Sequence, residues 1–192
     1  MRALTLLSLS VWLSACEMPQ SREALAGPTR PFGGTPHPIP GRIEAEDFDQ
    51  GAPGEAYFDI DEKNHGADYR GATQVDIEKR PDASGGHGIG WTRKGEWLLY
   101  TVQVLKAGTY TVEFPVASQK KGGTFHLEIN GKPITEAIRV PDTGGWKTLE
   151  IIRTYQIHLK AGTHLLKMVM DTEGPSKNIG DIDYLQFVRI GP

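Results

Sequence analysis

A strict alternation of apolar and polar residues constrains the fold of this chain more than any other feature. Segments 109–116, 125–129 and 155–160 each place apolar side chains at every second position. That period is typical of strands with one face in the core and one in water. Asn130-Gly131 separates two apolar runs and predicts a tight hairpin, because both residues tolerate positive φ. The sequence therefore predicts an all-β fold, a β-sandwich of about nine short antiparallel strands.

The N-terminal residues indicate export. Arg2 supplies a positive start, residues 3–13 are mostly apolar, and Ala15 is a small residue at the expected cleavage point, so residues 1–15 are predicted to be a signal peptide. Leu13-Ser14-Ala15-Cys16 looks like a bacterial lipobox, in which lipid is attached to Cys16. A stray thiol behind an ordinary signal is the alternative, since Cys16 has no partner Cys in the chain. Lipidation would place the protein in the bacterial cell envelope, membrane-anchored and facing the periplasm or the outside.

Residues 16–40 follow as a predicted tether. They are rich in Pro and Gly and show no apolar periodicity, so they bury too little surface to offset the entropy of ordering. Their prolines favour an extended chain. Residues 41–192 are long enough for one domain with a single core.

Charge and motif content narrow the classes of function. The net charge of −3 gives no basic footprint for nucleic acid, so no nucleic-acid partner is expected. The sequence carries no nucleophile elbow and no phosphate-binding loop, which argues against an enzyme. A small glycoside hydrolase or polysaccharide lyase is the remaining enzymatic alternative.

Two acidic residues near the start of the predicted domain suggest a cation. Glu44 and Glu46 are two apart on a predicted strand, so their carboxylates share a face. On a core-facing strand they would repel each other and lose hydration unless a cation neutralised them. Oxygen ligands favour Ca²⁺, and Asp183 is the natural third carboxylate if the terminal strands pair. An exposed acidic edge with Lys or Arg partners is the alternative.

Two tryptophans next to glycine turns are candidate sugar platforms. Trp91 follows Gly90, and Trp146 follows Gly144-Gly145. Aromatic rings can stack on the apolar faces of a sugar while polar groups bind its hydroxyls. Burial in the core is the alternative for both. Trp97, at the start of a predicted strand, is expected to be mostly core.

Three motifs together resemble carbohydrate-binding module family 6, a galactose-binding-like β-sandwich. They are Ile43-Glu-Ala-Glu-Asp47, the segment 88–102 and Asp181-Ile-Asp-Tyr-Leu-Gln-Phe187, and the resemblance covers roughly residues 42–188. It implies jelly-roll topology and a cleft flanked by Trp91 and Trp146. It also implies a structural Ca²⁺, whose ligands would be Glu44, Glu46, Asp183 and, less directly, a backbone carbonyl at Arg70.

The sequence departs from the family pattern at two places. Where the family commonly has Asn two residues before the calcium Asp, this chain has Asp181, which accepts hydrogen bonds but cannot donate as an amide can. Asn178 lies close enough in sequence to substitute. Arg93 stands where some members have an acidic residue; it favours an anionic glycan, or else it is a solvated loop residue.

The function implied by the resemblance is non-catalytic binding of a poly- or oligosaccharide by a membrane-anchored module, alone or beside a companion glycoside hydrolase. A structural cell-surface protein without a sugar site is a further alternative. The sequence leaves open which glycan is bound, and whether binding is at chain ends or within chains.

Overall fold

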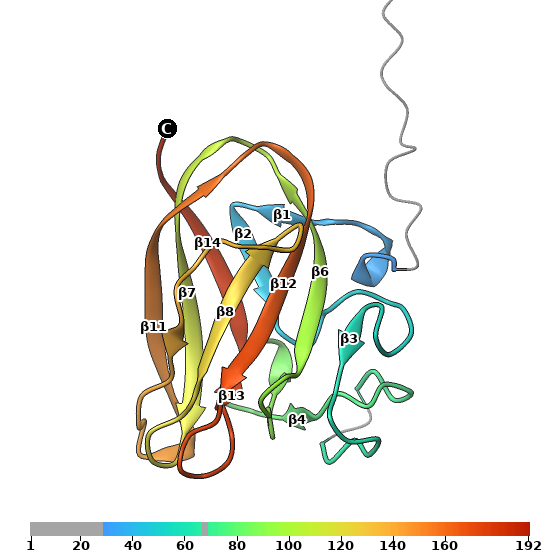
Figure 1. The fold of residues 1–192 in the computed structure, drawn as a ribbon, viewed down its shortest axis with the longest axis vertical. Helices are drawn as coiled ribbons and strands as arrows, with labels where there is room; N and C mark the ends of the chain where they lie inside the picture. Colours follow the sequence, from blue (N-terminus) through green and yellow to red (C-terminus); the bar gives the residue numbers. More distant parts are fainter. Residues whose placement is uncertain (1–28, 67–68) are drawn as a thin grey trace, which may run out of the picture.

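The computed structural model describes residues 29–66 and 69–192, which form two stacked β-sheets (Figure 1). The predicted signal peptide, Cys16 and most of the predicted tether lie outside these described residues. Within them, no helix has the length and apolar character that crossing a membrane requires.

The first sheet has β6 (Trp97–Val104), β12 (Gly162–Thr172) and β8 (Thr124–Ile129) at its centre. Shorter strands complete it: β1 (His37–Ile39) and β3 (Tyr57–Phe58) on β6, and β9 (Lys132–Pro133) and β10 (Ile138–Arg139) on β8.

The second sheet is built around β7 (Gly108–Ser118), which pairs with β14 (Tyr184–Gly191) on one side and β11 (Gly145–Leu159) on the other. Its remaining strands are β2 (Gly41–Glu44), β13 (Asp181–Ile182), β5 (His87–Ile89) and β4 (Ile77–Lys79). Two single 3₁₀ turns are η1 (Phe32–Gly34) and η2 (Ser84–Gly86).

The β-sandwich prediction is confirmed, but the expected count of about nine strands is too low. The described residues form 14 strands. Several of these, such as β9 and β13, are only two residues long, and a pair of residues shows no alternation that sequence inspection could detect. One pairing is also parallel, between β1 and β6.

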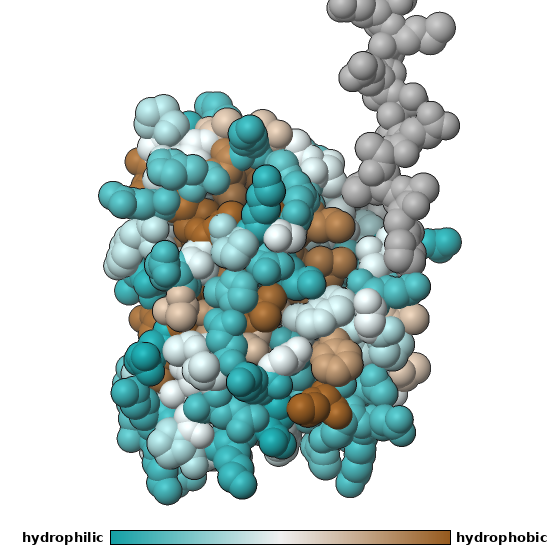
Figure 2. Space-filling view, viewed as in Figure 1, coloured by the Kyte–Doolittle hydropathy of each residue, from teal (hydrophilic) through white to brown (hydrophobic). Residues whose placement is uncertain are grey.

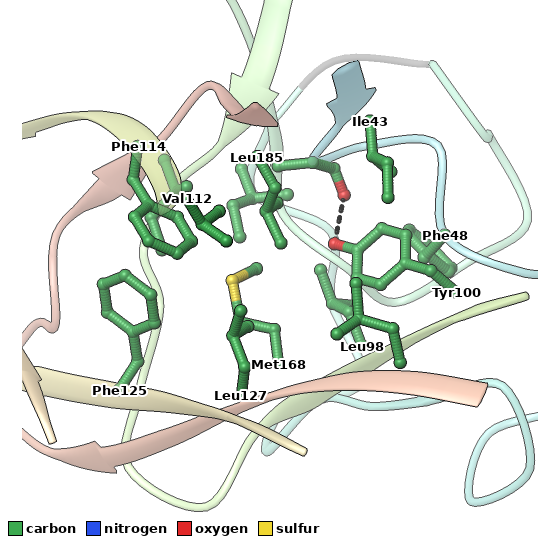
Figure 3. Packing of buried hydrophobic residues seen from close by; sticks show 14 of the residues in the cluster. Ile43, Phe48, Leu98, Tyr100, Val112, Phe114, Phe125, Leu127, Met168 and Leu185 are labelled. Atoms are coloured by element: carbon green, nitrogen blue, oxygen red, sulfur yellow. Dashed lines mark hydrogen bonds between the residues drawn. The ribbon is translucent and has the colours of Figure 1, made fainter. Parts of the chain in front are cut away.

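The core lies between the sheets and follows the alternation (Figure 3). Phe114 of β7 meets Phe125 of β8 edge to face, with ring centroids 5.1 Å apart. The buried Tyr100 hydroxyl donates to the Ala45 carbonyl at 2.8 Å, which satisfies the one polar atom that this ring carries inside.

Trp97 does not belong to this core, contrary to expectation. It is only half-buried, and the Lys167 ammonium lies 4.3 Å from its ring centroid. Leu98 and Tyr100 occupy the inner face of β6, so the period of two turns Trp97 to the outer face.

The domain also begins earlier than predicted. His37–Ile39 pairs with Val102–Val104, and Arg30 bridges to Gln50, so part of the expected tether is packed on the sheet. Proline is tolerated at this position because β1 is an edge strand, where one N–H is not needed for the ladder.

Candidate functional site

A cleft of about 420 Å³ opens at one end of the sandwich, where loops from both sheets meet. Four of the residues singled out from the sequence line it together: Trp91, Trp146, Asn178 and Asp181. They come from the loop after β5, the start of β11, the segment between β12 and β13, and the first residue of β13. Sequence-distant residues therefore converge on one concave surface.

The two tryptophans are held at the surface and not in the core. Trp91 is 43% exposed and has φ of 49°, a left-handed conformation that turns the chain sharply after Gly90. Trp146 is half-buried as the second residue of β11. Both rings line the cleft, as sugar platforms would.

Asp181 lies at the base of the cleft with one oxygen already engaged. The Arg80 guanidinium donates to its Oδ2 at 2.7 Å, and both side chains are almost fully buried. Burial raises the pKa of Asp181 to about 7, although Arg80 acts in the opposite direction. Gly90 lies beside Oδ1, where a Cβ atom would come within 3.2 Å. The glycine thus keeps space open around this oxygen.

Asn178 supplies the donor capacity that Asp181 lacks. Its Oδ1 accepts from the Gly180 N–H at 2.8 Å, and it lies 3.1 Å from the Thr92 hydroxyl, whose shorter acceptor is the Gly180 carbonyl at 2.7 Å. Because the oxygen is used within the protein, the amide NH₂ group carries the remaining hydrogen-bonding capacity of this side chain.

Three further cleft residues were not identified from the sequence: Glu78, Lys147 and Ser176. Ser176 is informative because its Oγ is buried and has no hydrogen-bond partner among the described residues. Buried hydroxyls are normally paired, so this one indicates a missing partner. Glu78 enters the cleft because β4 pairs with β5, opposite Gly88, and a three-residue strand gives no sequence signal.

Arg93 is not among the residues that line the cleft. Its Nε donates to Glu173 Oε1 at 3.0 Å, on the stretch that follows β12. The guanidinium charge is therefore balanced outside the cleft, which removes the geometric basis for assigning it to an anionic glycan.

The loops beneath the cleft are joined backbone to backbone. Gly122 and Gly123 donate to the carbonyls of Val140 and Ile179 at 3.1 and 2.8 Å. A Cβ atom at either glycine would collide with a neighbouring carbonyl oxygen. Glycine at both positions therefore permits the close approach that fixes these loops.

A second group of acidic residues, here called the carboxylate cluster, consists of Glu44, Glu46 and Asp183. The turn η2 holds it: the Ser84 N–H donates to both Asp183 oxygens at 3.0 and 3.1 Å, and the Ser84 hydroxyl donates to Glu44 Oε1 at 2.9 Å. Pairing of β2 with β14 brings the first and last parts of the domain together here, as the sequence predicted.

The carboxylate cluster has the chemistry of a cation site. Glu44 Oε2 and Glu46 Oε2 are buried and have no hydrogen-bond partner among the described residues. Burial and the neighbouring carboxylates raise the pKa of Glu46 to about 8 and that of Asp183 to about 6. These oxygens suit a hard cation such as Ca²⁺. In the described part of the chain, however, no three acidic, His or Cys side chains converge tightly enough to form a metal shell.

Arg70 has a contact that the sequence did not suggest. Its guanidinium donates to the carbonyls of Glu46 and Asp49, each at 3.1 Å, and stacks 3.9 Å from the Phe48 ring centroid. Its own carbonyl accepts from the Thr73 N–H at 2.8 Å. The side chain thus braces the segment after β2, and the carbonyl already has one partner.

The fold and this cleft define a class of protein, a β-sandwich binding module with an aromatic, polar cleft at its loop end. Residues 65–189 match the family described as carbohydrate binding module (family 6). The match covers more than half of the chain, and the chain belongs to this family.

Two individual proteins are similar to part of the chain. The alpha subunit of clotting factor G from Tachypleus tridentatus is 27% identical over 126 residues, and the beta-agarase AgaA from Microbulbifer thermotolerans is 25% identical over 126 residues. Each match covers 65% of this chain but only 17% and 28% of those proteins. The chain thus spans less than a third of the length of either relative.

Solved structures show the same fold. The binding module CBM6cm-2 of Cellvibrio mixtus lichenase 5A, solved with cellotriose, is 26% identical with a TM-score of 0.58, over 79% of this chain and 98% of that one. A beta-1,3-glucan binding module from Bacillus halodurans is 22% identical with a TM-score of 0.58, over 80% of this chain and 98% of that one. The second likeness establishes the fold alone.

Proposed function

We propose that this protein binds a poly- or oligosaccharide without catalysis, through the cleft between Trp91 and Trp146. The observation that carries this proposal is the convergence of two surface tryptophans with the polar side chains of Asn178 and Asp181. The cellotriose bound by CBM6cm-2, at 26% identity to this chain, supports a glycan as the ligand class.

Different residues of the cleft would make different contacts with a sugar. The indole rings would cover the apolar faces of a pyranose, and such stacking supplies much of the affinity. Asn178 would donate to a sugar oxygen, whereas Asp181 Oδ1 would accept from a hydroxyl while Arg80 holds Oδ2. Glu78 adds a second acceptor in the cleft. Together these groups present both donors and acceptors to a neutral sugar.

A structural calcium is part of the proposal. Glu44, Glu46 and Asp183 would hold it, and the two orphaned carboxylate oxygens are the observation that favours it. The ion would neutralise the carboxylate cluster and tie β2 to the segment that joins β13 and β14, so its contribution would be to stability.

The proposed cellular setting rests on the N-terminal sequence. Acylation of Cys16 would anchor the module in the bacterial cell envelope, with the stretch before residue 29 as a spacer. The match to part of a beta-agarase supports a setting beside a companion glycoside hydrolase.

A glycan array probed with the full chain, followed by titration of the best glycan, tests the binding function. Trp91→Ala and Trp146→Ala should each weaken binding by about 1–3 kcal/mol, as loss of an interfacial aromatic commonly does. Their melting temperatures should stay near that of the wild type, because neither ring is part of the core.

Tyr155→Ala is the matched control, since Tyr155 is an aromatic residue 63% exposed on β11 away from the cleft. Unchanged glycan affinity in both tryptophan variants would refute the cleft. Release of reducing ends, or of unsaturated products that absorb in the ultraviolet, would instead establish a hydrolase or a lyase.

A further inference from the structure

A second cleft lies away from the sugar-binding candidate, between the β8–β9 hairpin and the β11–β12 turn. It has a volume of about 310 Å³, and we call it the basic cleft. Figure 2 shows hydrophobic side chains exposed among hydrophilic ones between β8 and β11. The residues that line it are Ile129, Asn130, Lys132, Ile134, His158, Leu159, Lys160 and His164.

The lining differs in chemistry from that of the cleft flanked by Trp91 and Trp146. The basic cleft has two lysines and His158 at its rim and no acidic residue, although the chain as a whole carries a net charge of −3. Its apolar part consists of the partly exposed side chains Ile129 and Ile134 over the buried Leu159, without an indole or phenol ring. Positive charge beside an aliphatic surface suits a ligand with an anionic end and an alkyl body.

A hydrogen-bond brace holds the two turns that carry the lysines. Asn130 Oδ1 accepts from the Leu165 N–H at 2.9 Å, so its amide nitrogen is the donor to His164 Nδ1 at 3.1 Å. His164 must then carry its proton on Nε2, which donates to the Lys160 carbonyl at 2.9 Å. The brace thus fixes the turn before Lys132 against the turn that contains Lys160.

His158 completes the rim. Its Nδ1 lies 3.2 Å from the Thr109 hydroxyl on β7, which orients the ring, and Nε2 is the nitrogen left for a ligand. The brace fixes the backbone from which Lys132 and Lys160 project, and the His158 ring is oriented, so less entropy is lost on binding than at lysines on mobile loops.

We propose that the basic cleft binds a single-chain anionic amphiphile, an alkyl carboxylate or an alkyl phosphate, with its head group between Lys132 and Lys160 and its chain over Ile129, Ile134 and Leu159. The volume is at the lower end for small-molecule pockets, which run from about 300 to 1,000 Å³, so a short chain fits best. The proposal is independent of sugar binding, because the two clefts share no lining residue.

The test is calorimetric titration of the full chain carrying Cys16→Ser with decanoate and with decyl phosphate, both below their micellar concentrations. We expect saturable one-to-one binding of both probes. The paired change Lys132→Glu/Lys160→Glu should weaken that binding at least tenfold, while 1-decanol, acetate and inorganic phosphate should not bind measurably. Lys120→Glu/Lys121→Glu, two exposed lysines outside the basic cleft, is the matched control and should bind like the parent.

Two further measurements separate the cleft from general charge effects. Ile134→Ser should weaken decanoate binding severalfold, with folding checked by circular dichroism, because it shortens the aliphatic surface and leaves every charge in place. Vesicles of phosphatidylglycerol, compared with phosphatidylcholine, test whether the amphiphile is a membrane lipid.

The proposal is overturned if the Lys132→Glu/Lys160→Glu protein binds decanoate like the parent, or if the control pair loses as much affinity. It is also overturned if decanol binds as tightly as decanoate. Lysine-dependent binding to phosphatidylglycerol vesicles without any binding of the monomeric probes would show surface attraction to an anionic membrane in place of a cleft, and would equally overturn it.

Discussion

Asp181 and Asp183 flank a single residue, Ile182, yet they belong to two different acidic regions of the molecule. Asp181 lines the cleft flanked by Trp91 and Trp146 and pairs with the buried Arg80 guanidinium at 2.7 Å. Asp183 belongs to the carboxylate cluster, where its two oxygens accept from the Ser84 backbone N–H. The ion pair at that cluster, between the Arg42 guanidinium and Glu44 Oε1, is longer than the pair at Asp181, with a separation of 4.0 Å.

The difference indicates how the same residue type serves two purposes. The Arg80 guanidinium offsets the charge of Asp181 at one oxygen and leaves its second oxygen for a ligand. The carboxylate cluster has no comparably close cation among the described residues, so its stability depends on protons or on an added cation. Sugar binding and the response of stability to calcium should therefore be separable by substitutions only two residues apart.

The largest effect should come from removing the cation of the first region. Arg80 is 2% exposed and contacts Asp181, Asp82 and Glu78, so Arg80→Ala should destabilise the protein by about 3–5 kcal/mol because it leaves uncompensated buried charge. Guanidinium denaturation measures this loss. Lys79→Ala, the exposed neighbour on β4, should change stability little; equal losses would show that the ion pairs contribute nothing specific.

Removing calcium should affect the second region next. If Ca²⁺ binds the carboxylate cluster, about a hundredfold excess over its Kd stabilises the fold by about 2.7 kcal/mol, and chelation should lower the melting temperature by about 5–10 °C. Differential scanning calorimetry with calcium and with EDTA checks this. Asp183→Ala should abolish the difference and Asp181→Ala should keep it; identical melting curves in the wild type would eliminate the calcium site.

Glu96 is a third case, a buried carboxyl group that has neither an ion pair with Arg nor a proposed cation beside it. It is 8% exposed, and burial raises its pKa from 4.5 to about 8. Between those values the folded state binds the proton more tightly than the unfolded state, so stability should fall as pH rises, by up to about 1.4 kcal/mol per pH unit from this group. Denaturation at pH 6 and pH 8 should show a smaller decline in Glu96→Gln, and parallel declines would contradict the prediction.

The smallest effect should be that of Asp181 on sugar binding. Asp181→Ala removes one hydrogen-bond acceptor from a cleft that retains both tryptophans, so affinity for the preferred glycan should fall about fivefold, ~1 kcal/mol. Isothermal titration measures it. Asp82→Ala, which removes another partner of Arg80 outside the cleft lining, is the control; an equal loss there would mean that Asp181 acts only by positioning Arg80.

Sequence reasoning predicted the fold class and the surface positions of Trp91 and Trp146 from local signals, whereas Asn178 and Asp181 were predicted from the family resemblance. The alternation in β7 and β8 marks half-buried strands, and the glycines before Trp91 and Trp146 mark surface turns. The resemblance then joined motifs that are far apart in the chain, which no local pattern could do.

The missed features depend on pairing between distant segments. Glu78 reaches the cleft only because a three-residue strand pairs with β5, and Ser176 lies in an irregular loop. The prediction for Trp97 is wrong because apolar residues occupy both faces of β6 at its start. The sequence there shows no alternation that would tell the inner face from the outer one. The partner of Arg93, Glu173, is 80 positions away.

The glycine-locked loops beneath the cleft bear on how binding preferences can change over evolutionary time. Gly122 and Gly123 fix the loop framework through main-chain contacts, whereas the groups that meet a ligand, such as Trp146, Lys147 and Ser176, are side chains on that framework. Because main-chain contacts fix the loops, side chains at the rim of the cleft can be substituted without moving them. A new side chain there would change recognition alone. Recognition could therefore diversify through the rim residues alone, whereas any side chain at Gly122 or Gly123 would collide with the backbone and disrupt the loops themselves.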